Sequence, residues 1–153
     1  GPLATANGKR DIVELVEDAK AKGARVLCGG ETPEGLGFFY PATVIDQLTD
    51  DMKLVMEEAF GPVATIYKVQ NREEAIKIAN QTTFGLSSAI WSEDEAEQDY
   101  FVEHLQAGAV FVNGMTISYP ELAFGGIKDS GFGRELSDAG IKEFCNLKTV
   151  WKA

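Results

Sequence analysis

The chain has 153 residues, of which 44% are hydrophobic and 25% are charged, a composition typical of one globular domain or one lobe of a larger one. The formal net charge of −10 argues against nucleic acid and anionic membrane surfaces as partners, because binding to either requires clustered Lys and Arg. No apolar run could span a bilayer, no signal-peptide pattern is present and only two cysteines occur, so we expect a cytoplasmic protein.

The first half of the chain predicts one helix followed by strands. The helix is indicated by apolar residues at helical spacing, namely Ile12, Leu15, Val16 and Ala19. Gly23 is typical of the residue that follows a helix end. Short β-rich segments follow at residues 25–28, 38–45 and 62–69.

The second half alternates strands with helices. Residues 71–74 and residues 92–95 both have the pattern of a capping box, which predicts that a helix begins at each. The other predicted segments are strands at 88–91 and 109–113, a glycine-rich loop at 114–134, a short helix at 137–144 and a strand at 148–151. This alternation predicts an α/β fold in which helices flank a mostly parallel sheet.

The loop at residues 114–134 is the first place to look for a site. It follows a predicted strand, and ligands of parallel sheets bind at the carboxyl ends of the strands. A loop of this length inside a compact domain is usually functional. Its glycines do not follow the strand–turn–helix order of a dinucleotide fingerprint, so we reject that interpretation.

Two segments carry a family resemblance. The first is Glu57-Glu58-Ala59-Phe60-Gly61-Pro62, and the second is Ala123-Phe124-Gly125-Gly126-Ile127-Lys128-Asp129-Ser130-Gly131-Phe132-Gly133-Arg134-Glu135. In this order they resemble the C-terminal part of the catalytic domain of NAD(P)-dependent aldehyde dehydrogenases. The segment 143–152 is similar to that of bacterial succinate-semialdehyde dehydrogenases.

The resemblance spans the whole chain and implies its organisation. Residues 1–147 correspond to a C-terminal portion of the catalytic domain. Residues 148–153 correspond to a closing strand that pairs with another subunit of a homo-oligomer. Since the chain starts with Gly1 rather than Met and its first residues continue the family pattern, we expect a cut within a longer parent enzyme.

The resemblance implies that Glu58 and Phe60 contact the nicotinamide riboside of NAD or NADP. One carboxylate can accept hydrogen bonds from both ribose hydroxyls, and an aromatic ring offers a flat apolar surface. The alternative is that Glu57 and Glu58 form a solvated acidic patch at a helix end. The sequence does not choose between NAD and NADP, because the residue that faces the adenosine ribose lies outside it.

For the substrate, the resemblance implies Ser118 and Phe124. Ser118 matches a serine that hydrogen-bonds the distal carboxylate of succinate semialdehyde, and Phe124 matches an aromatic residue lining the substrate tunnel. The alternatives are a loop serine bound to local backbone and an aromatic residue of the core. The residue before Phe124 is Ala123, where the family commonly has Pro. Charged residues of the same segment are interpreted as structural and ion-paired: Lys128, Arg134 and Glu135.

No residue of the chain is expected to be catalytic or to bind a metal. Cys28 and Cys145 match neither the position nor the surroundings of the family's nucleophile, so we interpret both as small buried hydrophobic residues. His104 is the only histidine, which leaves a metal site or a Cys-His pair without support, and we expect it to be partly exposed on a helix.

Three hypotheses for function follow. In the first, the parent enzyme oxidises an aldehyde, succinate semialdehyde above all, to the carboxylate, and this chain alone is inactive because an upstream cysteine and glutamate perform the chemistry. In the second, the chain is a free-standing non-catalytic module of the same fold that acts by binding or assembly. In the third, the parent enzyme is a dehydrogenase for another small aldehyde.

Overall fold

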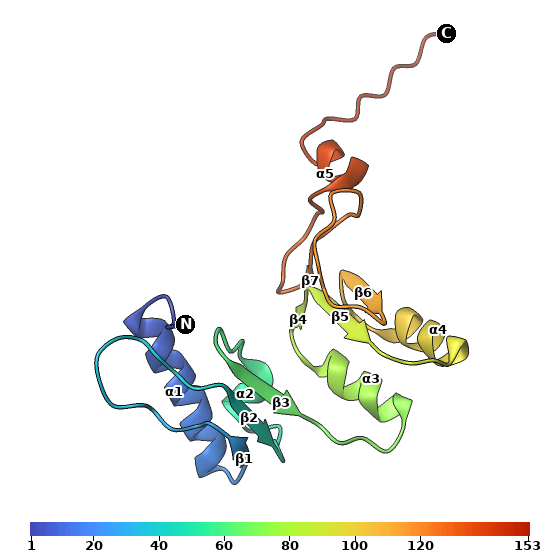
Figure 1. Cartoon of the computed structure of the whole chain (residues 1–153). Coiled ribbons are helices and arrows are strands. Elements are labelled where there is room, and N and C mark those ends of the chain that lie inside the picture. The colour runs from blue at the N-terminus through green and yellow to red at the C-terminus, as the bar shows by residue number, and fades with distance from the viewer. The chain divides into compact units, whose positions relative to one another are not determined.

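The computed structural model describes every residue from Gly1 to Ala153. The chain divides into two compact units, Gly1–Val69 and Gln70–Ala153, which we describe separately (Figure 1). None of the helices combines the length and the apolar composition that crossing a membrane would require.

The first unit is built on one long helix, α1 (Ala6–Ala21). The Thr5 hydroxyl accepts a hydrogen bond from the Gly8 N–H at 3.0 Å and so caps the start of α1. The helix ends before Gly23, whose φ of 97° lies in the left-handed region that glycine adopts without strain. The apolar periodicity therefore predicted this helix and its end correctly.

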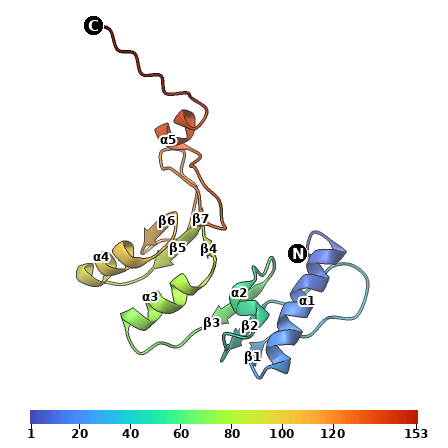
Figure 2. The same ribbon diagram turned by 180° about the vertical axis from the view of Figure 1, so that it is seen from behind.

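A three-stranded sheet completes the first unit. Strand β2 (Thr43–Asp46) lies between β1 (Arg25–Cys28), to which it is antiparallel, and β3 (Val63–Ile66), to which it is parallel. A short helix, α2 (Lys53–Met56), lies between β2 and β3 in the chain. Figures 1 and 2 both show α1 lying along this sheet. The largest fully buried side chains of the unit come from α1, β2 and the residue before α2: Ile12, Val16, Thr43, Ile45 and Met52.

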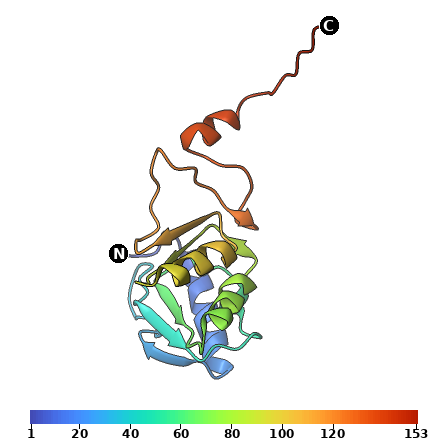
Figure 3. The same cartoon turned by 90° about the vertical axis from the view of Figure 1, so that its right-hand side faces the viewer.

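The second unit begins with two helices and a parallel pair of strands. Helices α3 (Arg72–Gln81) and α4 (Glu95–His104) lie side by side (Figure 3), and β5 (Ser87–Ile90) is parallel to β6 (Ala109–Val112). The Arg72 guanidinium lies over the Tyr100 ring, 4.1 Å from its centroid, and so joins the two helices.

Side-chain caps define the starts of these two helices. The Asn71 side chain accepts from the Glu74 N–H at 2.8 Å, as the first capping-box pattern predicts. The Glu74 carboxylate accepts from the Gln70 N–H instead of closing the box on Asn71. The predicted cap at Ser92 is wrong by two residues, because the Asp94 side chain accepts from two N–H groups of the first turn and so caps α4.

The rest of the second unit is a loop with little regular structure. Strand β4 (Phe84–Gly85) pairs antiparallel with β7 (Ile127–Lys128), and a short helix, α5 (Ser137–Lys142), follows. Residues 148–153 form no strand within the chain and are exposed. The predicted pairing of that segment with another subunit therefore stays a prediction.

The α/β class is confirmed. The chain contains three small sheets, and two of the four strand pairings are antiparallel. The prediction that both cysteines are buried is wrong, since both are exposed. Cys28 lies on β1, which pairs only with β2 and is therefore an edge strand of the sheet.

Candidate functional site

The first candidate site is the segment that follows α2, residues 57–61. Glu57 caps the C-terminus of α2 in an extended conformation, and its N–H donates to the Lys53 carbonyl at 2.8 Å. Beyond it, Glu58 and Phe60 are exposed, with 78% of Phe60 accessible. Between them Ala59 packs against the core, so Glu58 and Phe60 are exposed on either side of an inward-facing residue.

This segment presents an unpaired carboxylate beside an aromatic ring. The Glu58 carboxylate has no hydrogen bond or ion pair within the chain, so all of its acceptor positions are free for a ligand. The exposed ring of Phe60 adds an apolar surface two residues away. These groups fit a sugar diol attached to a flat ring. Exposure is equally compatible with a solvated acidic patch, so the role of Glu58 stays a prediction.

The second candidate site is the loop that leaves β6. Asn113 begins it with a φ of 53°, and its side chain accepts from the Ser92 N–H and donates to the Ser92 carbonyl, each at 2.9 Å. The Ser87 hydroxyl donates to the Thr116 hydroxyl at 3.2 Å. Ser118 follows and is exposed. Its hydroxyl has no hydrogen-bond partner within the chain, and its role stays a prediction.

Phe124 lies in the part of the same loop that leads into β7, which we call the returning arm. Its backbone forms an isolated bridge with Glu135, with N–H···O distances of 2.9 and 2.8 Å in the two directions. The side chain is half-buried and lines a concavity of about 480 Å³, together with the glycine-rich turn and the rings of Phe132 and Phe144. Phe124 therefore packs on one side and faces an open surface on the other.

The charged residues of this segment fold the loop by hydrogen bonds to backbone. The Lys128 ammonium donates to the carbonyls of Asn80 and Thr82, at 2.9 and 3.0 Å. The Arg134 guanidinium donates to two glycine carbonyls of the loop, the shorter bond being 2.7 Å. The prediction of ion pairs is therefore wrong: Lys128 and Arg134 form structural hydrogen bonds instead, and the Glu135 side chain forms neither a hydrogen bond nor an ion pair. Arg134 thus satisfies carbonyls of the glycine-rich turn, and Lys128 satisfies carbonyls at the C-terminal end of α3.

Ser130 is a positioning residue that the sequence did not reveal. Its hydroxyl accepts from the Gly85 N–H at 3.0 Å and so ties the loop to β4. A Cβ atom on Gly126 would lie 2.5 Å from the Ser130 Cβ, so the turn closes only with glycine at that position. The only signal in the sequence was the position of Ser130 among the glycines.

The remaining candidate groups form no site. Cys28 and Cys145 lie far apart in sequence, and each thiol faces only a backbone carbonyl, at 3.8 and 3.5 Å. His104 is exposed, and its ring stacks on Tyr100 with 4.2 Å between centroids. No group of three or more His, Cys, Asp or Glu side chains is arranged to hold a metal ion.

Comparison with protein families matches nearly all of the chain. The model described as "Aldehyde dehydrogenase family" matches residues 1–150. A curated protein of Mycobacterium ulcerans, "Succinate-semialdehyde dehydrogenase [NADP(+)] 1", is 58% identical over 99% of this chain and 33% of its own length. A protein of the same name from Mycobacterium tuberculosis is 56% identical over 100% of the chain and 34% of its length. The chain therefore spans about a third of the length of these relatives.

Solved structures give the same result. A succinic semialdehyde dehydrogenase from Streptococcus pyogenes, solved with NADP⁺, is 39% identical with a TM-score of 0.92, over 99% of this chain and 33% of that one. An NAD-dependent aldehyde dehydrogenase from Sinorhizobium meliloti is 34% identical with a TM-score of 0.89, over 94% of this chain and 29% of that one.

Proposed function

This chain belongs to the aldehyde dehydrogenase family, and we propose that it is the C-terminal third of a cytoplasmic parent enzyme that oxidises succinate semialdehyde to succinate with NADP⁺. The observation that carries the proposal is identity of 56–58%, over essentially the whole chain, to proteins named NADP⁺-dependent succinate-semialdehyde dehydrogenases. The same names favour NADP⁺ over NAD⁺, a choice that the sequence alone left open.

In the proposed enzyme, the first unit of this chain holds part of the cofactor. The Glu58 carboxylate accepts hydrogen bonds from the two hydroxyls of the nicotinamide ribose, and the Phe60 ring packs beside the riboside. Support comes from the free acceptor positions of Glu58 and the exposed ring of Phe60. When bound, NADP⁺ accepts the two electrons removed from the aldehyde.

The loop of the second unit recognises the substrate. We propose that the Ser118 hydroxyl donates a hydrogen bond to the distal carboxylate of succinate semialdehyde, and that Phe124 forms part of the tunnel wall. The exposure and the free hydroxyl of Ser118 support this role. A polar tail requires a donor in this position, whereas an alkyl tail would be better bound by an aromatic ring.

This chain supplies binding and orientation, and the covalent chemistry is assigned to the rest of the parent enzyme. The overall reaction consumes aldehyde, NADP⁺ and water and yields carboxylate, NADPH and two protons. We propose that its cysteine nucleophile and its general base lie outside these residues. The chain alone is therefore expected to show no aldehyde oxidation. We also propose that residues 148–153 pair with another subunit in a homo-oligomer.

The cofactor role is tested by replacing Glu58 in the parent enzyme. Glu58→Gln removes one charged acceptor and is expected to raise the KM for NADP⁺ by about tenfold, the loss typical of one charge-assisted hydrogen bond. The KM for succinate semialdehyde should change little. Glu57→Gln is the matched control, because it neutralises the neighbouring carboxylate. Equal cofactor affinity in the Glu58→Gln enzyme and wild type would remove Glu58 from the cofactor site.

A further inference from the structure

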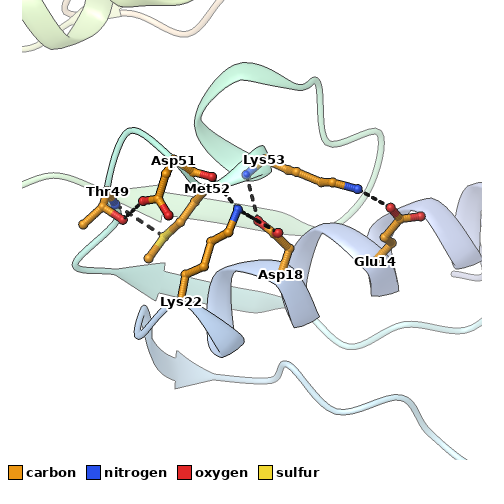
Figure 4. Close-up of polar contacts among 7 residues, drawn as sticks. All are labelled: Glu14, Asp18, Lys22, Thr49, Asp51, Met52 and Lys53. Atoms are coloured by element: carbon orange, nitrogen blue, oxygen red, sulfur yellow. Dashed lines mark hydrogen bonds and ion pairs between the residues drawn. The ribbon is translucent and has the colours of Figure 1, made fainter.

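A polar network joins α1 to the start of α2 in the first unit (Figure 4). The Asp18 carboxylate, on α1, accepts a hydrogen bond from the backbone N–H of Lys53 at 2.9 Å. It also forms an ion pair of 2.9 Å with Lys22, whose ammonium donates in addition to the Asp51 carbonyl. One turn along α1, Glu14 pairs with the Lys53 ammonium. The backbone and the side chain of Lys53 are therefore both held by α1.

Asp18 supplies the cap that α2 lacks. Met52 precedes α2 in the N-cap position, and its side chain makes no capping hydrogen bond. The first N–H groups of a helix have no partner within it. For Lys53, the first residue of α2, the partner is an oxygen from a residue 35 positions earlier in the chain. The start of this four-residue helix is thus capped from α1 rather than by a side chain of its own segment.

Helix α1 also holds the far end of residues 57–61, the segment that follows α2. Gly61 lies against Ile12 of α1, so closely that a Cβ atom on Gly61 would be 2.7 Å from the Ile12 Cγ1 atom. Ile12 is itself 1% exposed and has little room to move. Residues 57–61 are therefore fixed on α1 at both ends, by Asp18 through α2 and by Ile12 through Gly61.

We infer that Asp18 is a positioning residue for the cofactor: by capping α2 from α1, it fixes the direction in which Glu58 and Phe60 are presented. Neither residue is held by side-chain contacts of its own, since Glu58 has no partner and Phe60 is largely exposed. Their placement depends on the backbone that Asp18 and Ile12 hold. This inference rests on the proposed function of Glu58.

The first test compares two aspartates of the parent enzyme. Asp18→Ala removes the cap and is expected to raise the KM for NADP⁺ roughly tenfold, since small displacements of a positioning group are costly. The KM for succinate semialdehyde and the Kd of 2′,5′-ADP, the part of NADP⁺ that lacks the whole nicotinamide riboside, should stay unchanged. Asp18→Asn keeps an oxygen acceptor and should restore the KM for NADP⁺. Asp46→Ala is the matched control, because Asp46 is also ion-paired and its side chain is 18% exposed against 17% for Asp18.

The second test removes the donor instead of the acceptor. Lys53→Pro deletes the N–H that Asp18 binds, and proline is tolerated as the first residue of a helix. The extended conformation of Met52, with ψ of 133°, suits a residue before proline. Lys53→Ala keeps the N–H and loses only the ion pair with Glu14. We expect Lys53→Pro to raise the KM for NADP⁺ as Asp18→Ala does, and Lys53→Ala to leave it within about twofold, as expected of an exposed ion pair.

The outcomes separate this inference from the proposed function. A purely structural role of Asp18 would lower the fraction of active enzyme, and with it kcat, at unchanged KM for NADP⁺, and would overturn the inference. If Glu58→Gln raises that KM while Asp18→Ala and Lys53→Pro do not, only the inference fails. If Glu58→Gln has no effect, the proposed cofactor role fails first and the inference fails with it. Should Asp18→Ala not fold, the comparison of Lys53→Pro with Lys53→Ala decides.

Discussion

Gly108 lies so close to Gly125 that a Cβ atom on Gly108 would be 1.7 Å from the Gly125 carbonyl oxygen. Gly108 directly precedes β6, and Gly125 directly follows Phe124 on the returning arm of the loop. The Gly108 N–H also donates to the Gly85 carbonyl at 3.0 Å. Two backbone segments therefore cross in contact at this point, which fixes the arm that carries Phe124.

Replacing Gly108 should consequently loosen the loop. Gly108→Ala cannot be accommodated without moving the backbone of Gly125, and we expect it to lower the free energy of unfolding of the parent enzyme by about 2–4 kcal/mol. Urea denaturation and protease cleavage within residues 114–134 measure the effect. Gly114→Ala is the control, because its Cβ would meet no atom closer than 3.8 Å. Equal stability of Gly108→Ala and wild type would show that this crossing tolerates a side chain.

Ser118 gives the prediction for substrate selection. Ser118→Ala in the parent enzyme should raise the KM for succinate semialdehyde about tenfold, because a hydrogen bond to a charged group is lost. The KM for an uncharged aldehyde of similar length should stay within about twofold, since it has no carboxylate to bind. Ser118→Thr keeps the hydroxyl and serves as the control. A parallel change for both aldehydes would remove the succinate-semialdehyde assignment from Ser118.

Acid should weaken the ion pair between Arg25 and Asp46. The Arg25 guanidinium donates to the Asp46 carboxylate, at 2.9 Å through Nε, and this hydrogen bond lowers the pKa of Asp46. A carboxyl whose pKa is lowered by folding contributes stability above its ordinary value of about 3.9 and loses it as the pH falls through the lowered pKa. Asp46→Asn should therefore be less stable than wild type at pH 7.

The difference between the two proteins should disappear in acid. Thermal unfolding of wild type and Asp46→Asn, followed from neutral pH to below the lowered pKa of Asp46, measures it. Added salt should shrink the difference at pH 7, because the pair is at the surface and is screened. A difference that is independent of pH would assign the effect to packing rather than to charge.

The sequence predicted the elements whose determinants are local and missed those that depend on distant contacts. Helix α1 was found from its own apolar periodicity and Gly23. Helix α2 was missed because its cap comes from Asp18, on another element. Strands β4 and β7, of two residues each, exist only as partners of one another.

The candidate site shows the same division. Glu58 and Phe60 were identified from a motif. Neither composition nor periodicity could have shown that both are exposed while Ala59 packs against the core. The burial predicted for Cys28 was wrong, because an apolar strand sequence does not reveal that its strand lies at a sheet edge.

The most direct test of the central claim is the initial rate of NADPH formation by the purified parent enzyme with succinate semialdehyde, compared with butanal, a four-carbon aldehyde without the carboxylate. We expect a kcat/KM at least about tenfold higher for succinate semialdehyde, the discrimination expected from one hydrogen bond to a charged group. We also expect a higher kcat/KM with NADP⁺ than with NAD⁺. Equal or faster oxidation of butanal would contradict the assignment of succinate semialdehyde as the substrate.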